Sequence, residues 1–441
     1  MLNALKLLYL PTYCILSFYG QFSELFETCT GIRQGAASSV LLFIVFINDL
    51  IIYLKSKCVD EPLIDNLHCL LHADDTAILS TERSLFIRKC NYMLEYLNEN
   101  KLGLNLGKSG YLIINGKEAD TKSTINLNNG SLKYKKSVIY LGAIISDSGN
   151  INNDIQLHIN DKRSNVTVKF TNFCSKNIIA PIMIKLKVLN TCVAPALTYA
   201  CETWGKVNNR NLESIYRTGL KTALGVRNCT NNEIVYIESG SYPLTCTIQK
   251  QQMKFWNNIK VYTQNQPDAP LSKLLQYSKS VKLPYIMHYI HMNDKYESPE
   301  YCYQSLTSDF ATRWSTKIRT NIDENSKLGA YLKVNRDLTT PDYNKLFEIE
   351  RISVTQYRTG SHNLMIELGR YTVPTTPREE RLCKCNEAIQ TLEHCTLYCP
   401  LLVEARKQIT SKDLFSFIKH EHIHQFLITM ERTLRIKKII L

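Results

Sequence analysis

The sequence lacks several features that would assign the chain to a special class of protein. It has no internal repeat with a period of about 20–50 residues, which excludes solenoids and repeat arrays. With 17 glycines and 13 prolines among 441 residues, and 44% hydrophobic residues, the chain is not collagen, a coiled coil or wholly disordered. Its 15 cysteines are odd in number and scattered. We therefore predict no disulfide scaffold, but buried thiols in a reducing compartment together with one metal cluster.

Long apolar runs without polar interruption are also missing. The segment Leu2–Phe18 is apolar but contains a lysine and a proline, and no clear cleavage site follows it, so a signal peptide is not predicted. The segment Val40–Leu54 is interrupted by Asn48 and Asp49, and a carboxylate in so short a run is costly in a bilayer. Both segments are predicted to be core elements of an intracellular protein, nuclear or cytoplasmic, with no membrane partner.

Basic residues outnumber acidic ones. Lys and Arg total 53 against 40 for Asp and Glu, which gives a formal charge of +13 and a pI near 9.0. This excess favours an anionic partner, either nucleic acid or an acidic membrane surface, and does not choose between them. The length predicts roughly two to four domains, with a core that needs neither disulfides nor metals.

Hydrophobic periodicity predicts helices over residues 39–57 and 84–102, the second ended by Gly103. Between them, the apolar runs His68–Ala73 and Thr76–Leu79 flank an acidic pair. This is the pattern of a β-hairpin with the two carboxylates at its turn. Short β-like runs follow at Tyr111–Ile114, Ser123–Leu127 and Ile139–Ile145.

The pattern becomes helical from about residue 152. Residues 152–260 are helical in periodicity and rich in Lys, Arg and Asn, and residues 262–300 carry four prolines and are predicted to be a connector. Helical periodicity returns over 301–370, and residues 371–400 are loop-like and contain a Cys/His cluster. The tail ends in a basic amphipathic run, Arg432–Lys438.

The acidic pair, Asp74 and Asp75, is the first candidate for chemistry. Adjacent carboxylates at a hairpin tip are costly unless a cation lies beside them, and Mg²⁺ binds through one or two carboxylates plus substrate phosphates. Two such ions can hold the attacking oxygen and the leaving phosphate of an in-line displacement. The alternative is a solvated turn, because Asp-Asp pairs are common.

The motifs around the acidic pair point to one family. In chain order they are Gly31-Ile32-Arg33-Gln34-Gly35, Ile47-Asn48-Asp49-Leu50, His72-Ala73-Asp74-Asp75, Gly103 to Ser109 with Lys108, and Tyr140-Leu141-Gly142. Their order and gaps resemble the palm of reverse transcriptases of non-LTR (LINE-type) retrotransposons. Residues 152–260, including Tyr199–Trp204, are similar to the helical thumb and connection region of such proteins.

The resemblance implies an α+β fold and four regions. These are a partial palm with an antiparallel sheet backed by helices at 1–150, a helical thumb-like region at 151–262, a connector and helical region at 263–370, and a small zinc-knuckle-like region with a basic tail at 371–441. The implied function is RNA-directed DNA polymerisation. RNA template, DNA primer and dNTPs are the implied partners, and Mg²⁺ or Mn²⁺ is the implied palm cofactor.

The resemblance also implies roles for single residues. Asp74 would be the main ligand of the catalytic metals and Asp75 a weaker one. Lys108 would neutralise or protonate the departing pyrophosphate. The nucleotide- and template-binding residues would be Arg33, Gln34, Gly35 and His72, and the primer grip would be Tyr140, Leu141 and Gly142. The alternatives are a plain helix-entry turn at Gln34-Gly35 and an ordinary surface lysine at 108.

Departures from the family pattern predict impaired catalysis. Ser38-Ser39-Val40 stands where the family has Leu-Ser-Pro, and His72 replaces an aromatic residue beneath the primer end. The third palm carboxylate, expected in an Asp-x-x-x-Ala-Phe-Asp segment, is absent from residues 1–30, whose only acids are Glu24 and Glu27. We therefore expect an N-terminally truncated protein, without endonuclease and fingers, that has little or no polymerase activity alone.

A Cys/His cluster near the C-terminus is the second candidate site. Cys383, Cys385, His394 and Cys399 form a Cys₃His set with ligand types and spacing that suit tetrahedral Zn²⁺. The surrounding prolines and sparse apolar residues leave little core, so a metal would supply stability. The alternative is a small core of reduced cysteines. The cluster also resembles the C-terminal zinc-binding region of the same retroelement proteins, although C-x-C replaces the commoner C-x₂-C.

Two other functions compete with an impaired polymerase. A non-catalytic nucleic-acid-binding protein would use the basic helical region and the zinc knuckle. The basic and aromatic residues before the cluster would then follow a phosphate backbone and stack on bases, or would form only a solvated basic face. They are Arg351, Tyr357, Arg358, His362, Arg370, Tyr371, Arg378 and Arg381. A membrane-associated protein using the apolar N-terminus is the third hypothesis.

Overall fold

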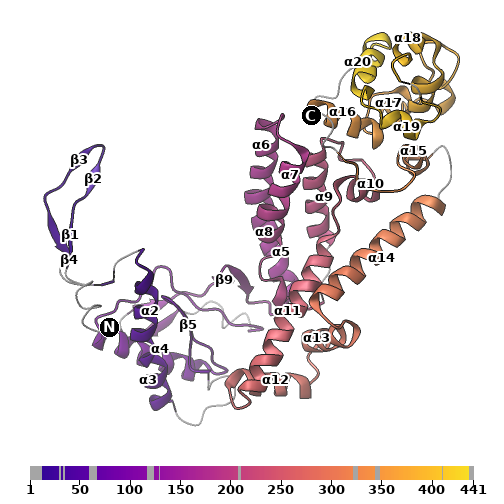
Figure 1. Ribbon diagram of the computed structural model, residues 1–441. Helices are drawn as coiled ribbons and strands as arrows, with labels where there is room; N and C mark the ends of the chain where they lie inside the picture. Colours follow the sequence, from indigo (N-terminus) through magenta and orange to yellow (C-terminus); the bar gives the residue numbers. More distant parts are fainter. Residues whose placement is uncertain are drawn as a thin grey trace. The chain divides into compact units, whose positions relative to one another are not determined.

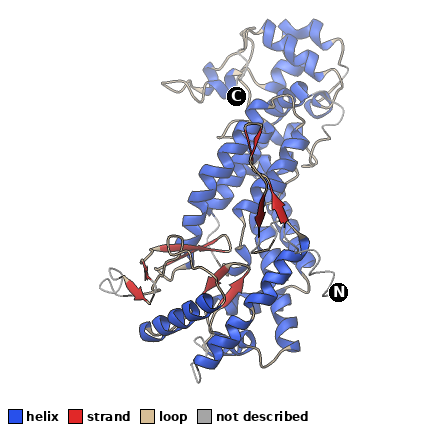
Figure 2. Ribbon diagram, turned by 90° about the vertical axis from the view of Figure 1, so that its left-hand side faces the viewer, coloured by secondary structure: helices blue, strands red, loops and turns tan. Residues whose placement is uncertain are grey.

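The computed structural model describes residues 12–28, 31–32, 35–58, 67–116, 124–128, 130–206, 210–320, 326–342, 348–409 and 411–436. The chain divides into two compact units. The first comprises Met1–Leu141 with Pro267–Tyr277, and the second comprises Gly142–Gln266 with Ser278–Leu441. Helices make up most of the described chain and the strands are short (Figure 2).

The first unit begins with an exposed β-hairpin arm (Figure 1). Strand β1 (Thr12–Cys14) pairs with β4 (Phe26–Thr28), and β2 (Ser17–Phe18) pairs with β3 (Gln21–Phe22) nearer the tip. Ile15, Leu16 and Phe18 are 52%, 66% and 75% exposed. The prediction that Leu2–Phe18 is a core element is therefore wrong for residues 13–18, because a two-stranded arm leaves both of its faces open. Residues 2–11 lie outside the described part of the chain.

Three helices pack in the first unit, and its core lies mainly between the second and the third, because the first leaves most of its apolar side chains exposed. They are α2 (Ala37–Ile47), α3 (Asp49–Lys57) and α4 (Arg83–Glu99). The apolar face of α3 buries Leu50 and Leu54 completely, and these pack with Met93 and Tyr96 of α4. The helix predicted over 39–57 is two helices, because Asn48 is a turn and Asp49 begins α3 with a carboxylate in its first turn.

The structure contains one apolar stretch that is long enough to cross a membrane by length and composition. This stretch is Ser38–Lys57, and it is the only such candidate within the ranges described above. It consists of α2 and α3 and contains the polar pair Asn48 and Asp49.

Helix α4 ends at Glu99, three residues before the predicted last residue of the helix, residue 102. Lys101 adopts a left-handed conformation with φ of 58°, and the Leu102 N–H donates to the Leu97 carbonyl at 2.8 Å. This is the Schellman pattern, with Lys101 in the position that glycine usually takes. Gly103 does not have a positive φ, so the prediction that Gly103 ends this helix is wrong.

The strands of the first unit are shorter than predicted. β5 (Leu70–His72) pairs with β6 (Asp75–Ala77), and β7 (Ile125–Leu127) pairs with β8 (Gly130–Leu132). The run Tyr111–Ile114 contributes only an isolated bridge from Tyr111 to Tyr134. The run Ile139–Ile145 is not one strand. β9 (Ser137–Tyr140) ends at a turn, and β10 (Ala143–Ser146), which already belongs to the second unit, follows it.

The second unit is built from helices. Its first part consists of α5 (Ile151–Lys162), α6 (Val168–Lys176), α7 (Ile182–Val188), α8 (Ala194–Leu197), α9 (Arg210–Leu224), α10 (Asn232–Ser239) and α11 (Leu244–Asn265). Leu189, Leu197, Leu212, Leu220 and Leu224 are fully buried in one core between them. The helical periodicity predicted over 152–260 is thus confirmed.

Prolines begin the next helices of the chain. α12 (Pro270–Ser280), α13 (Pro284–Lys295) and α14 (Pro299–Thr320) each start at a proline, since the first helical residue needs no N–H donor. In the second unit, α14 packs along α11 (Figure 1), and Met253, Met292 and Leu306 join α11, α13 and α14 in one cluster.

The C-terminal part of the second unit has its own core. It contains α15 (Lys327–Val334), α16 (Glu348–Arg358), α17 (Met365–Leu368), α18 (Val403–Arg406), α19 (Leu414–Ile418) and α20 (Ile423–Thr433). Phe417, Phe426 and Leu427 are buried there together with Cys383, Cys395 and Cys399. Of the loop predicted over 371–400, residues 371–393 are mostly turns and bends, but His394–Tyr398 form a short π-helix, so the prediction is wrong for that turn. Of the basic run Arg432–Lys438, residues 437 and 438 lie outside the described part.

Candidate functional site

The acidic pair lies at the tip of a two-residue β-hairpin. Strands β5 and β6 pair with Leu70 opposite Ala77 and His72 opposite Asp75, so Ala73 and Asp74 form the turn. Ala73 has φ of 52°, as the first turn residue of a tight hairpin requires. His72, Asp74 and Asp75 are exposed. The predicted hairpin with carboxylates at its turn is therefore confirmed, and both carboxylates are open to solvent.

Tyr140 lies close enough to the hairpin to interact with it electrostatically. Partial burial raises the pKa of the Tyr140 hydroxyl, and the negative charge of Asp75 and the Cys69 thiol raise it further. The structure thus brings a predicted primer-grip residue near one member of the acidic pair. The two residues are 65 positions apart in the sequence, so this proximity is a product of the fold.

The turn after Tyr140 has a special backbone conformation. Leu141 and Gly142 have φ of 50° and 80°. Two consecutive residues with positive φ form the type I′ turn that joins tightly connected strands, and glycine suits its second position. A Cβ at Gly142 would lie 3.0 Å from the Tyr199 ring, so space as well as φ selects glycine there.

Lys108 lies in a turn of the first unit with its side chain exposed. Its N–H donates to Asn105 Oδ1 at 3.1 Å, and its carbonyl accepts from Lys135 Nζ at 2.7 Å. No ion pair joins Lys108 to Asp74 or Asp75, all three of which are described. Gly35 has φ of 83° and precedes α2, and its Cβ position is open. Arg33 and Gln34 lie outside the described residues.

The predicted Cys₃His set converges in space. One ligand atom from each of Cys383, Cys385, His394 and Cys399 lies within 4.8 Å of the others. Cys383 Sγ and Cys399 Sγ are 3.7 Å apart, and Cys385 Sγ lies 3.2 Å from His394 Nε2. Two sulfur ligands of a tetrahedral zinc site are separated by about 3.8 Å, given zinc–sulfur bonds of about 2.3 Å. These donors fit a metal-binding group.

The backbone of the segment favours this arrangement. The Asn386 N–H donates to the Cys383 carbonyl at 2.9 Å, and the left-handed Asn386 (φ 61°) closes a tight turn around Cys385. Hydrogen bonds from the Cys395 thiol and from the Cys385 N–H lower the pKa of the Cys383 thiol well below its usual value. A thiolate is the form of cysteine that binds metal. Cys395, which is not part of the predicted ligand set, lies against Cys383.

The basic segment before the cluster is only partly available to a ligand. Arg358 is buried and makes a two-pronged ion pair with buried Glu238, with Nη2 to Oε1 at 2.8 Å. Arg381 is buried and donates to the carbonyls of Thr376 and Ile366. The prediction that these side chains follow a phosphate backbone is wrong for both arginines, because they donate their hydrogen bonds to acceptors within the protein.

The rings of Tyr357 and His362 are also unavailable to a nucleic acid, because both are buried. His362 is buried, and burial, followed by the charges of Arg227 and Lys327, lowers its pKa to about 3. Its ring stacks on buried Tyr357 at 5.1 Å between centroids. The exposed aromatic residue of the segment is Tyr371, which lies beneath Arg227 and Lys327 at 5.5 and 5.7 Å.

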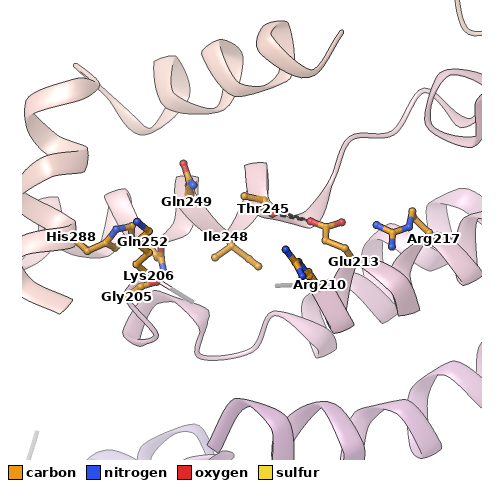
Figure 3. A pocket seen from close by; sticks show the side chains of 10 residues that line it. All are labelled: Gly205, Lys206, Arg210, Glu213, Arg217, Thr245, Ile248, Gln249, Gln252 and His288. Carbon is orange, nitrogen blue, oxygen red and sulfur yellow. Dashed lines mark hydrogen bonds between the residues drawn. The ribbon is translucent and has the colours of Figure 1, made fainter. Parts of the chain in front are cut away.

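A cleft that the sequence does not reveal lies in the second unit (Figure 3). It has a volume of about 530 Å³ and is lined by α9, α11, α13 and the turn at Gly205 and Lys206. Its lining side chains come from three separated parts of the chain, near residues 210, 249 and 288, and no local motif marks it. Helical amphipathicity indicates which faces of α9 and α11 are polar, but not that they face each other.

A comparison with protein families identifies the region that contains the acidic hairpin. Residues 2–145 match the family model described as reverse transcriptase (RNA-dependent DNA polymerase). The matched residues contain the acidic hairpin, Gly35, Lys108 and Tyr140. The N-terminal third of the chain is therefore a reverse transcriptase-like domain, and the Cys₃His group and the cleft lie outside it. A search of curated proteins finds no match to the chain.

Proposed function

We propose that the chain is a reverse transcriptase-like protein descended from a non-LTR (LINE-type) retrotransposon, and that its acidic hairpin is the metal site of an RNA-directed DNA polymerase. The observation that carries this proposal is the position of Asp74 and Asp75, exposed at a two-residue hairpin tip within residues 2–145. The proposed partners of the chain are an RNA template, a DNA primer and dNTPs.

The hairpin residues suit a divalent cation. Two solvent-open carboxylates at adjacent positions offer hard oxygen ligands, which Mg²⁺ and Mn²⁺ accept together with substrate phosphates. When bound, the ion neutralises phosphate charge and lowers the pKa of the attacking hydroxyl. Asp74 supplies the main ligand and Asp75 a weaker one, and His72, opposite Asp75, stacks beneath the primer end.

The proposal also assigns a role to each of the other residues that match the motifs of the family. Tyr140, Leu141 and Gly142 hold the primer, and the link from Tyr140 to Asp75 supports this role. Lys108 neutralises the departing pyrophosphate. Arg33 and Gln34 contact the template and nucleotide, and Gly35 permits their close approach because its φ suits a residue without Cβ.

We further propose that the chain alone has little or no polymerase activity. The acids that precede Arg33 are Glu24 and Glu27, and both are exposed on the β-hairpin arm, where Glu27 faces Tyr13 in the strand register. Neither follows the pattern of the third palm carboxylate. Loss of one metal ligand removes several kcal/mol of transition-state stabilisation, which is orders of magnitude in rate.

A metal-binding measurement tests the proposed metal site, and a primer-extension assay tests the proposed inactivity. We expect the full chain to bind Mn²⁺ at the hairpin tip, as measured by paramagnetic broadening of NMR signals near the tip. This binding should be lost in Asp74→Asn. The variant Asp268→Asn removes an exposed carboxylate of the same unit and should bind Mn²⁺ as the parent does. Primer extension by the parent should stay near background. Template-dependent extension abolished by Asp74→Asn would show an active enzyme and refute the proposed inactivity.

The second candidate function is nucleic-acid binding without catalysis. The Cys₃His geometry and the net charge of +13 support it, because a metal-closed knuckle can present basic residues to RNA. We expect one Zn²⁺ per chain by native mass spectrometry, and loss of both Zn²⁺ and RNA affinity in Cys385→Ser. The exposed, unclustered Cys192 gives the control Cys192→Ser. RNA binding that is unchanged in Cys385→Ser would refute this function.

A further inference from the structure

The β-hairpin arm of the first unit exposes a large amount of apolar side chain. Its two paired segments, β1 with β4 and β2 with β3, form a narrow two-stranded ribbon that leaves both faces open (Figure 1). Eight large apolar side chains of the arm are 41–94% exposed. They are Tyr13, Ile15, Leu16, Phe18, Tyr19, Phe22, Leu25 and Phe26. The arm therefore carries a surface that is costly to leave in water.

The exposed area of the arm is large for a chain on its own. A whole aromatic side chain has an area of about 150–250 Å², so the apolar side chains of the arm expose on the order of 1,000 Å². Monomeric proteins rarely expose a continuous apolar patch of more than a few hundred Å². A typical stable interface buries about 800 Å² from each partner. The arm alone thus offers the area that a stable dimer needs.

Helix α2 presents a second apolar surface in the same unit. Phe43 and Ile47 attach α2 to the core that it shares with α3 and α4. On another side of the helix, Leu41, Ile44 and Val45 are 64%, 46% and 64% exposed. Ile44 and Val45 follow Leu41 by three and four positions, so the three side chains form one helical face. The helix contains no charged residue, so this face is purely apolar.

The arm and this face of α2 do not cover each other within one chain. Both elements belong to the first unit, and the side chains of both surfaces remain exposed in it. A ribbon of strands and an apolar helical face are surfaces that can pack together as a sheet packs on a helix. Since each chain carries one arm and one such face, two chains related by a twofold axis can bury both arms on both helices.

The charge of the arm indicates the kind of partner. Residues 12–28 contain two acids, Glu24 and Glu27, and no lysine or arginine. A negatively charged arm disfavours nucleic acid and acidic lipid as its partners. A second copy of this chain, with a formal charge of +13, attracts it. The helix that follows α2 also ends in two exposed lysines, Lys55 and Lys57.

We propose that a second copy of the chain covers these surfaces, so that the protein is a dimer in which the arm of each chain packs on the exposed face of α2 of the other. The contact is reciprocal, and the dimer therefore contains it twice. This inference does not rest on the polymerase proposal, because it uses none of the residues assigned there to metal, nucleotide or primer.

The test is sedimentation velocity of the full chain after nuclease treatment, which removes RNA that could bridge two basic chains. We expect the parent to sediment as a dimer at micromolar concentration. The arm variant, Phe18→Ser with Phe22→Ser, should raise the dimer dissociation constant at least about a hundredfold, and so should the helix variant, Leu41→Gln with Val45→Gln.

A control variant separates these surfaces from exposed apolar residues in general. Ile114 and Ile139 belong to the first unit and are 55% and 75% exposed, but they lie in neither surface. The variant Ile114→Ser with Ile139→Ser should dimerise as the parent does. Circular dichroism spectra of all variants are compared with the parent.

A mixture of the two interface variants identifies which surfaces meet. The intact arm of the helix variant can pack on the intact α2 of the arm variant, so heterodimers should form in the mixture although neither variant dimerises alone. A variant that failed to fold could not restore this contact. Arms that paired with each other would instead leave the helix variant dimeric.

Several results would overturn the proposal. They are a parent that stays monomeric at micromolar concentration, an arm or helix variant that dimerises as the parent does, and interface variants that do not pair when mixed. Sedimentation with phosphatidylcholine vesicles tests the other occupant of the α2 face. A monomeric parent that binds the vesicles, and loses this binding in the helix variant, would assign that face to a lipid surface instead.

Discussion

Single buried residues decide how much of the basic surface is available to ligands. Arg358 donates through Nε and Nη2 to Glu238, and Tyr331 donates to the same carboxylate at 2.8 Å. Glu238 is 120 residues away in sequence, so a charge pattern around Arg358 cannot reveal its partner. The sequence shows the sign of each charge but not whether the side chain is buried, which is why residues 351–381 resemble a ligand-binding face.

Removing Arg358 should destabilise the fold strongly. In Arg358→Met, Glu238 keeps its burial but loses its counter-charge, and we expect the free energy of unfolding to fall by about 3–5 kcal/mol. Urea denaturation followed by circular dichroism measures the change. The control Lys407→Met breaks an exposed pair with Glu404 and should cost less than about 1 kcal/mol. Similar losses in both variants would contradict the role of burial.

His362 should make stability depend on pH. Its folded-state pKa is lowered to about 3, against about 6.5 in an unfolded chain. Between these values the unfolded chain binds the additional proton, so stability falls as the pH falls from about 6.5 towards 3. At pH 5 this residue should remove about 2 kcal/mol relative to pH 7.

The variant His362→Asn isolates this contribution. An asparagine oxygen can accept from the Leu364 N–H in place of Nδ1, which accepts at 3.3 Å in the parent, and asparagine does not titrate. Denaturation midpoints at pH 7 and pH 5 should therefore differ less in His362→Asn than in the parent, while the exposed-histidine control His291→Asn should behave as the parent does. An unchanged pH dependence in His362→Asn would reject the assignment.

At the scale of elements, local sequence predicts which segments form but not where each one ends. The hairpin over 70–77 is predictable because its apolar runs and turn are contiguous in the sequence. The end of α4 is not, because Lys101 takes the left-handed position although Gly103 is only two residues away. The hydrogen bond from Leu102 to Leu97 and the packing of Leu102 against α3 and α4 fix that position.

This difference gives a matched pair of substitutions. Lys101→Gly should raise the free energy of unfolding by about 0.5–1 kcal/mol, because the left-handed conformation penalises a side chain. Gly103→Ala should be neutral or slightly stabilising, since its φ is negative and nothing lies near its Cβ position. Thermal unfolding of both variants measures this. Destabilisation by Lys101→Gly would show that the lysine side chain contributes more than its backbone conformation costs.

At the scale of the whole molecule, the candidate sites differ in how far the sequence predicts them. The Cys₃His ligands lie within residues 383–399, so their spacing alone predicts a metal geometry. The cleft residues come from segments near 206, 213, 249 and 288, and only the packing of α9 and α11 brings them together. The polymerase-like region lies between these cases, since its motifs are local but Tyr140 reaches Asp75 through the fold.

The net charge of the molecule should govern its affinity for RNA. With a formal charge of +13, binding should release counterions, and affinity for single-stranded RNA should fall about a hundredfold between 50 and 200 mM NaCl if roughly five phosphates are contacted. Fluorescence anisotropy across this range gives the slope. Affinity that does not change with salt would show that ionic contacts contribute little.

The compactness of the Cys₃His segment has a consequence for synthesis of the protein. Because all four donors belong to one short stretch, closing the loop costs little entropy, and ion capture requires no residue from the preceding 382. If this group binds a metal ion, as we propose, a growing polypeptide can acquire the ion as soon as Cys399 leaves the ribosome. The ion would then provide a fixed point on which the late helices assemble.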